Sequence, residues 1–216
     1  METFFVSKVS ITIFVPDMEN KIIERALDLF LNLGFKNVTM DEIAKETGIS
    51  KKTIYQFFEN KNTLILACLN SMTLEINKNI SFVKEKNYNA VVEQMEVKKL
   101  IMRQLKSEKT SPHYQLQKYY PKIYANVRSR HKEIMSTCVA DNLAKGIKEG
   151  LYRKEINIDI VTKIHFICAI EIKNEDHFPP EKYSVLEIMN TYTENFLRSM
   201  VTTKGLEILE QQLKQQ

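Results

Sequence analysis

The sequence predicts an all-α protein, from its composition and from the spacing of its apolar residues. Of 216 residues, 44% are apolar, which is enough for a buried core, but only 5 are Gly and 5 are Pro. A β-sandwich or barrel needs many more turn residues. Apolar residues instead recur every three or four positions over long stretches, which is the period of an amphipathic helix. We therefore expect a small N-terminal three-helix unit followed by a larger helical domain.

Capping residues divide the N-terminal part into short elements. The apolar spacing predicts a helix over residues 18–33, and Gly34 ends it because glycine readily adopts the left-handed conformation of a C-terminal cap. Thr39 and Glu42 have the spacing of a capping box, in which each side chain satisfies a free backbone N–H. The other caps are, in order, Gly48, Ser50 and Asn60. They predict a short helix over residues 51–57 and a long helix after it.

The helical pattern continues through the rest of the chain. One helix follows residue 87 and is broken by the polar stretch 106–112, after which Pro112 and Pro121 bracket an aromatic-rich segment. A long helix then runs to residue 148. The last three helices are expected at about residues 158–173, 183–200 and 206–213.

Several classes of protein and site are excluded by what the sequence lacks. Cys68, Cys138 and Cys168 are widely spaced and odd in number, which fits neither a disulfide framework nor a zinc site. The histidines form no metal-binding motif, and no nucleophile–base pair is evident, so we expect no metal, no cofactor and no enzyme activity. No apolar run reaches the ~18 residues of a membrane span. We expect a cytoplasmic protein without a membrane partner, in which residues 1–17 form an extension and Met18 is an alternative start.

Charge is distributed unevenly along the chain. Residues 1–61 contain 8 basic and 9 acidic residues, whereas residues 78–154 contain 17 basic and 7 acidic ones. The basic middle segment could attract a polyanion or an anionic ligand. We prefer the simpler interpretation that its long solvated helix faces carry lysines.

Two short helices joined by residues 46–50, with Gly48 in the turn, match a helix-turn-helix. Glycine permits the tight turn, and the second helix can then enter a DNA major groove ~12 Å wide. Its exposed face would consist of Lys51, Lys52, Thr53 and Gln56. Its core side would consist of Ile54, Phe57 and Phe58.

An ordered series of residues from Ile22 to Leu64 resembles the TetR family of bacterial transcription regulators. The series includes Ala26, Leu29-Phe30, Gly34-Phe35, Thr39-Met40, Ile43-Ala44, Gly48-Ile49-Ser50, Thr53-Ile54-Tyr55, Phe58 and Lys61. The resemblance implies a DNA-binding domain over residues 18–66 and a helical ligand-binding and dimerisation domain over residues 67–216. It also implies a homodimer that binds a double-stranded DNA operator, most simply as a repressor released by a small-molecule effector. The alternatives are an activator, or a second domain that is structural or answers to a protein partner.

The resemblance also implies roles for individual residues of the DNA-binding domain. Thr39, Tyr55 and Lys61 would contact phosphates, while Lys51, Lys52, Thr53 and Gln56 would face base edges or adjacent phosphates. Tyr55 could instead be a core aromatic residue. Phe57 and Glu59 depart from the family pattern, because histidine and a basic residue are common at those positions. Together with the acidic balance of the domain, they predict modest affinity or a strong dependence on salt.

The larger domain offers apolar and aromatic candidates for an effector pocket and a dimer interface. The pocket candidates are Met95, Met102, Arg103, Tyr114, Tyr120, Tyr124 and Phe166, with Arg103, His113 or Lys99 as a polar group that orients the ligand. The interface candidates on the helices at 158–173 and 183–200 are Val161, Ile164, Phe166, Ile167, Ile170, Leu186, Met189, Phe196 and Leu197. Each could alternatively be a core residue of the protomer.

Overall fold

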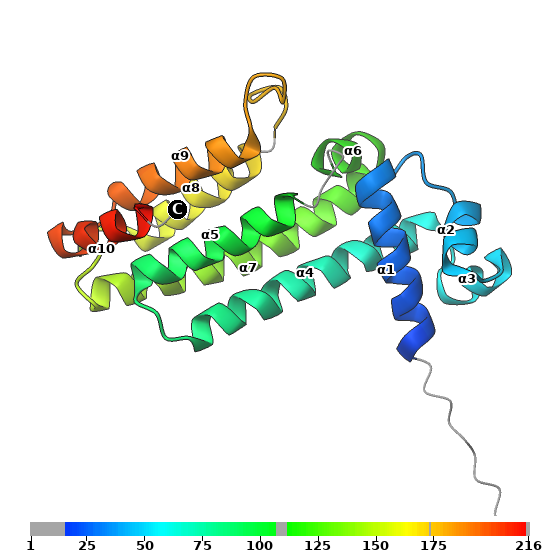
Figure 1. Cartoon of the computed structure of the whole chain (residues 1–216), viewed down its shortest axis with the longest axis horizontal. Coiled ribbons are helices and arrows are strands. Elements are labelled where there is room, and N and C mark those ends of the chain that lie inside the picture. The colour runs from blue at the N-terminus through cyan, green and yellow to red at the C-terminus, as the bar shows by residue number, and fades with distance from the viewer. Residues whose placement is uncertain (1–15, 107–111, 173, 215–216) are drawn as a thin grey trace, which may run out of the picture.

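The protein folds entirely into helices over the residues that the structure describes. This structure is a computed structural model, and it describes residues 16–106, 112–172 and 174–214. The helices are α1 (Pro16–Leu33), α2 (Met40–Thr47), α3 (Lys51–Phe57), α4 (Lys61–Glu85), α5 (Ala90–Lys106), α6 (Pro112–Tyr119), α7 (Pro121–Lys148), α8 (Ile158–Glu171), α9 (Val185–Arg198) and α10 (Thr203–Leu213) (Figure 1). The predicted all-α class is confirmed. The predicted extension lies outside the described residues, apart from its last two positions, which belong to α1.

The helix ends are formed by the capping residues that the sequence indicates. The Thr39 hydroxyl accepts a hydrogen bond from the Glu42 backbone N–H at 3.2 Å, and Glu42 accepts one from the Thr39 N–H at 2.7 Å. The Asn60 side chain caps α4 by accepting from the Thr63 N–H at 3.0 Å. Gly34 and Gly48 have φ angles of 92° and 73°, in the left-handed region that favours glycine. Because these signals are local, they fix the helix boundaries from the sequence alone.

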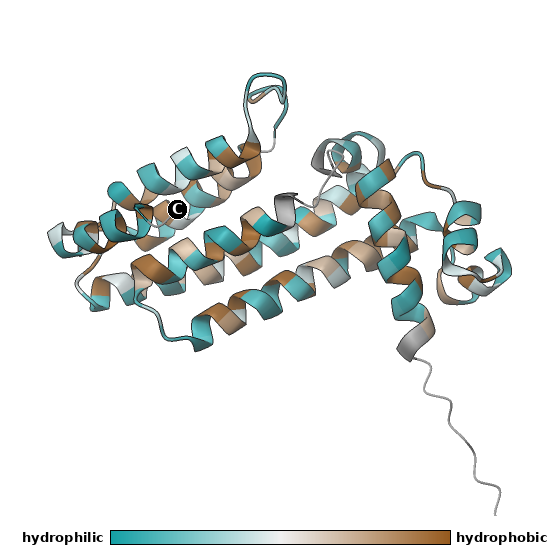
Figure 2. Cartoon of the chain, in the orientation of Figure 1, coloured by the Kyte–Doolittle hydropathy of each residue, from teal (hydrophilic) through white to brown (hydrophobic). Residues whose placement is uncertain are grey.

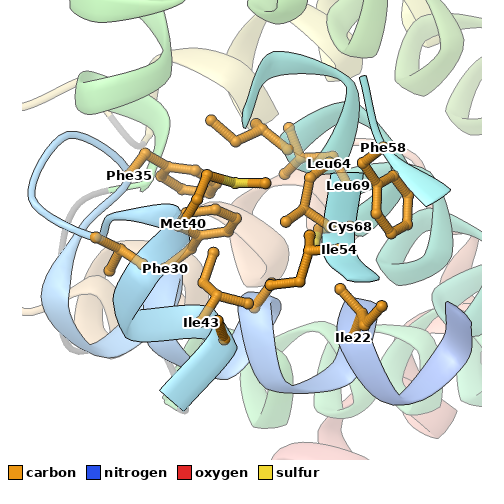
Figure 3. Close-up of a cluster of buried hydrophobic side chains, with 14 of the residues drawn as sticks. Ile22, Phe30, Phe35, Met40, Ile43, Ile54, Phe58, Leu64, Cys68 and Leu69 are labelled. Atoms are coloured by element: carbon orange, nitrogen blue, oxygen red, sulfur yellow. The ribbon is translucent and has the colours of Figure 1, made fainter. Parts of the chain in front are cut away.

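The first hydrophobic core contains buried side chains of the four helices α1, α2, α3 and α4 (Figure 3). Phe30 of α1 stacks on Phe35 of the following turn, with ring centroids 5.1 Å apart. Ile54 of α3 and Leu64 of α4 are fully buried in the same cluster. The cluster also includes Leu116 of α6 and Val127 of α7. The first core is therefore built in part by residues far beyond the N-terminal helices.

The predicted domain boundary at residue 66 lies within α4, which runs without interruption from Lys61 to Glu85. Helices α4, α5 and α7 lie side by side, and α8, α9 and α10 form the far end of the molecule (Figure 1). Apolar and polar stretches alternate along these helices (Figure 2), as expected of amphipathic helices that share a core. The division at residue 66 remains a prediction, because a continuous helix crosses it.

A buried polar network fixes the start of α5 against the end of α7. The Glu93 carboxylate pairs with the Lys145 ammonium at 2.6 Å and accepts from the Asn142 amide at 2.8 Å. The Tyr152 hydroxyl donates toward this network and lies 3.1 Å from both Ala90 O and Asn142 Oδ1. Each buried polar group thereby gains a partner, which avoids the cost of an unpaired one. The network sets the relative position of the two helices at the end of the molecule away from α3.

The described residues contain no helix that is both long and apolar enough to cross a membrane. In the same residues, no group of three or more His, Cys, Asp or Glu side chains could hold a metal ion.

Helices α8 and α9 are joined by an aromatic contact that includes a histidine. His165 Nδ1 lies 2.7 Å from the Tyr192 hydroxyl oxygen, and the His165 ring centroid lies 4.6 Å from that of Phe196. Burial in this contact lowers the pKa of His165 from 6.5 to about 4. The folded protein therefore holds His165 neutral at pH values where the unfolded chain would protonate it.

This histidine predicts acid sensitivity of the folded state. Between pH 6.5 and pH 4 the unfolded chain binds a proton that the folded protein does not, so the free energy of unfolding falls as the pH is lowered through this range. The contribution of His165 should be up to about 3 kcal/mol. Denaturant unfolding of wild type and His165→Gln at both pH values measures it. Equal pH dependence of the two proteins would contradict the assignment.

Candidate nucleic-acid interface

Helix α3 presents a polar face to solvent and an apolar face to the first core. Its start is fixed by Ser50, whose hydroxyl accepts from the Thr53 N–H at 3.0 Å. Ile54 is fully buried and Tyr55 is 45% exposed, so the two faces are clearly separated. At the outer end of the molecule (Figure 1), the exposed side chains of α3 are Lys51, Lys52, Tyr55 and Gln56. They are four of the five predicted DNA contacts on this helix, and the fifth, Thr53, is half-buried.

The structure adds Asp41 to this surface, a residue that the sequence analysis did not select. Lys51 Nζ forms an ion pair with the Asp41 carboxylate at 2.7 Å. Asp41 belongs to the first turn of α2, where an acidic side chain also interacts favourably with the positive end of the helix dipole. The hydrogen bond to Asp41 raises the pKa of Lys51, so the lysine remains charged. DNA and Asp41 would therefore compete for the same ammonium group.

Thr39 and Lys61 lie close to the turn between α1 and α2, and both already have partners. The Thr39 hydroxyl also donates to Glu42 Oε2 at 2.9 Å. The hydrogen bonds from the Thr39 backbone N–H and from its hydroxyl lower the pKa of Glu42. Lys61 is half-buried and donates to Lys36 O at 3.3 Å. Its Nζ lies 5.8 Å from the centroid of the Phe30 ring, within the range of a cation–π contact. Burial lowers the pKa of Lys61. Lys61 would have to turn outward to meet a phosphate.

The two residues that depart from the family pattern lie where the sequence suggests. Phe57 is half-buried and packs against the first core, while Glu59 is exposed next to the end of α3. Phe57 therefore offers no hydrogen bond to a phosphate. Glu59 adds a negative charge beside α3, which would weaken DNA binding.

The predicted effector residues do not meet in one place. Met95 is buried in a second hydrophobic core, which also contains Leu143 of α7 and Leu197 of α9, whereas Tyr120 and Tyr124 pack against the first core. Met102 and Phe166 are buried, and Arg103 and Tyr114 are exposed. Their assignment to a shared pocket remains a prediction.

A groove of about 380 Å³ instead lies between α4 and α7. Its lining residues are Asn77, Ile80, Ser81, Lys84, Glu133, Ile134, Thr137 and Cys138. Burial raises the pKa of the Cys138 thiol, which therefore stays protonated at neutral pH. The sequence analysis missed this groove because no motif marks its residues.

Part of the predicted dimer face is exposed on α8 and α9. Ile164 and Ile167 are 52% and 58% exposed, and Ile160, one turn earlier, is 53% exposed. Leu186 is 42% exposed on α9, and Met189 and Phe196 are half-buried. Phe166 and Leu197, also expected at this interface, are instead buried within the protomer.

Comparison with known proteins agrees with the N-terminal motif and with the whole fold. The family model described as "Bacterial regulatory proteins, tetR family" matches residues 22–68. The uncharacterized HTH-type transcriptional regulator YuxN of Bacillus subtilis is 43% identical over 56 residues, which are 26% of this chain and 19% of YuxN. The biofilm operon icaADBC HTH-type negative transcriptional regulator IcaR of Staphylococcus aureus is 38% identical over 47 residues, which are 22% of this chain and 25% of IcaR. The aligned segments thus span a quarter or less of these curated relatives.

Similarity of fold extends over nearly the whole chain. The solved structure of a transcriptional regulator of the TetR/AcrR family from Thermobifida fusca superimposes with a TM-score of 0.63 and 21% sequence identity. The match covers 84% of this chain and 97% of that one. Because the sequence identity is low, this match is evidence of a similar fold alone. The family model thus matches the segment that forms the helix-turn-helix, and the solved structure shows that the all-α fold of this chain is shared with a regulator of the TetR/AcrR family.

Proposed function

We propose that the protein is a homodimeric, sequence-specific DNA-binding regulator, acting as a repressor that a small-molecule effector releases from its operator. The observation that carries this proposal is the exposed polar face of α3, held at the outer end of the molecule by the Gly48 turn and the Ser50 cap. A helix held in this way can enter the major groove with its N-terminal side chains near base edges. The negative regulation named for IcaR supports repression as the direction of control.

The roles of the α3 residues follow from their chemistry and position. Gln56 can form paired hydrogen bonds with an adenine edge, which distinguishes one base from another. Tyr55 exposes a hydroxyl that can donate to a phosphate, a contact that does not depend on sequence. Lys51 and Lys52 add charge at the start of the helix, where the positive end of the helix dipole already favours an anion.

Dimerisation supplies the spacing that an operator requires. Ile160, Ile164 and Ile167 are spaced to lie on one face of α8, where their exposure in a single protomer leaves apolar surface that a second copy would cover. A dimer presents two recognition helices related by a twofold axis, and DNA accepts them when they are ~34 Å apart or a small multiple of that distance. Any change that alters this spacing lowers the affinity for DNA.

We place the effector in the groove between α4 and α7. Its volume of about 380 Å³ lies within the ~300–1,000 Å³ that small-molecule sites occupy. One wall belongs to α4, which begins next to α3 and belongs to the first core. A ligand that separates α4 from α7 would therefore shift the DNA-binding helices. By linkage, DNA would weaken the binding of that ligand by the same factor by which the ligand weakens the binding of DNA. The coupling free energy is typically ~1–3 kcal/mol.

Specific binding to DNA from immediately upstream of the protein's own gene is the direct test. Fluorescence anisotropy at two salt concentrations should show saturable binding that exceeds binding to random DNA by ~10³-fold or more. Equal binding to both DNAs, lost equally at the higher salt concentration, would indicate attraction to phosphates alone and would contradict sequence-specific regulation at this site.

Two substitutions on α3 should separate positioning contacts from sequence recognition. Tyr55→Phe removes a phosphate donor, so it should weaken binding to upstream and random DNA alike, by a factor of about five (roughly 1 kcal/mol). Gln56→Ala should reduce the preference for upstream DNA over random DNA, because it removes a base contact worth ~1–3 kcal/mol. Anisotropy titrations of both variants on both DNAs measure this. The same pattern for the two variants would contradict the assigned roles.

Removing the competitor of Lys51 should increase affinity for DNA. Asp41→Asn deletes the carboxylate that pairs with Lys51 and one negative charge beside α3, so affinity at low salt should rise by a factor of about three to ten, with a smaller gain at higher salt. The matched control is Asp159→Asn, which breaks a Lys–Asp pair of the same 2.7 Å length on α8. Unchanged or weaker binding by Asp41→Asn would contradict the competition between Asp41 and DNA for Lys51.

A further inference from the structure

A group of lysines and tyrosines lies at the surface where α6 meets the turn between α1 and α2. Lys36 Nζ lies 4.7 Å from the centroid of the Tyr119 ring, and Lys118 Nζ lies 5.5 Å from the same centroid. Lys118 Nζ also lies 5.0 Å from the Tyr114 ring centroid and donates to the Tyr114 hydroxyl at 2.7 Å. We call Lys36, Tyr114, Lys118 and Tyr119 the α6 cluster. All four residues are exposed.

The α6 cluster is continuous with the residues that would contact DNA phosphates. Lys36 lies three positions before Thr39, and its carbonyl oxygen accepts a hydrogen bond from Lys61 at 3.3 Å. Lys36 and Lys118 share the ring of Tyr119. A chain of contacts thus leads from Lys61 through Lys36 and Tyr119 to Lys118, across the turn and onto α6.

Packing fixes α6 to the DNA-binding helices. Leu116 is 5% exposed and belongs to the first core, together with Phe35 and Ile54. The Tyr120 hydroxyl donates to Phe35 O at 3.1 Å. Figure 1 shows α6 beside the C-terminal end of α1. The lysine of α6 is therefore held at a fixed distance from the α1–α2 turn, as a preorganised contact requires.

The stretch of chain that contains α6 and the first part of α7 carries basic residues and no acidic ones. No acidic residue occurs between residues 112 and 132, while the basic ones are Lys118, Lys122, Arg128, Arg130 and Lys132. In the described part of the chain, the ion pairs involve neither Lys36 nor Lys118. The partner of Lys118 is a neutral hydroxyl, which leaves its charge available to an anion.

We propose that the α6 cluster binds the DNA backbone, through Lys36 and Lys118, at phosphates flanking the sequence that α3 reads. This rests on the proposed DNA-binding function and adds a second contact surface to it. We choose DNA phosphates as the partner because Lys36 and Lys118 place two ammonium groups over the Tyr119 ring. Two neighbouring positive charges suit the regularly spaced negative charges of a DNA backbone. Among the described residues, neither lysine lines the groove between α4 and α7. Contacts of this kind add affinity without sequence preference and compensate for the unfavourable Phe57 and Glu59.

The test compares Lys36→Gln and Lys118→Gln with a matched lysine elsewhere. Lys86 also stands over an aromatic ring, 4.4 Å from the Phe82 centroid, but it follows the other end of the 25-residue helix α4. That end lies ~37 Å from the start of the helix at 1.5 Å per residue. Lys86→Gln therefore changes net charge equally without altering the α6 cluster. Lys52→Gln on α3 serves as the positive control for DNA binding.

Binding is measured by anisotropy over a series of salt concentrations, on a random-sequence duplex of about 40 base pairs, roughly four helical turns. Each cluster variant should bind about five- to tenfold more weakly at ~0.1 M salt, with the slope of log K against log salt reduced by about 0.9 per lost contact. Lys86→Gln should match wild type. Thermal unfolding of each variant checks that the fold is retained.

The possible results separate this inference from the proposed function. If Lys52→Gln weakens binding while both cluster variants match wild type, the α6 cluster does not contact DNA and the function stands. If Lys86→Gln weakens binding as much as Lys118→Gln does, net charge explains the effect and the inference is overturned. A wild-type protein that binds neither this duplex nor the DNA upstream of its own gene would overturn both.

Discussion

The position of the recognition helix depends on how the turn between α1 and α2, residues 34–38, is held. Phe35 is fully buried in this turn and stacks on Phe30, and the Tyr120 hydroxyl donates to its carbonyl oxygen at 3.1 Å. Gly34 accommodates the turn with a positive φ and lies so close to Gln115 that an added Cβ would be 2.6 Å from its Oε1. These contacts bring α6 and the start of α7 into the core that supports α3. The DNA-binding domain that is predicted over residues 18–66 thus depends on packing by residues of the larger domain.

A second connection between the two parts is α4 itself. Three hydrogen bonds along its length join it to α7: Asn70 to Arg130 at 2.6 Å, Thr73 to His131 at 3.2 Å, and Lys84 to Asp141 at 3.0 Å. The last of these lies at the groove that we propose for an effector. Because α4 is continuous with the cap at Asn60, a displacement at the groove would be transmitted along a rigid helix. A small displacement of α4 relative to α7 can regulate such a structure, because packed interfaces shift between discrete arrangements and do not deform continuously.

The helix-turn-helix could be predicted from the sequence because its signals are local. The capping box at Thr39, the left-handed Gly48 and the Ser50 cap each act within a few residues, and the alternation of Ile54 with exposed neighbours follows from helical spacing. The effector site could not be predicted, because tertiary packing decides which apolar residues line a cavity and which fill the core. In the structure, Met95 is a core residue, and the Tyr120 hydroxyl binds the turn between α1 and α2. The chemistry of both side chains would also suit a ligand pocket. The pairing of Lys51 with Asp41 depends on how two helices pack, which spacing alone does not reveal.

The central claim is that two copies of this chain present their α3 helices to DNA about one helical turn apart. Hydroxyl-radical footprinting of the wild-type protein on DNA upstream of its gene tests this most directly. We expect protected backbone patches related by twofold symmetry, with centres ~34 Å apart or a small multiple of that distance. A single protected patch, or protection without symmetry at high occupancy, would contradict the account.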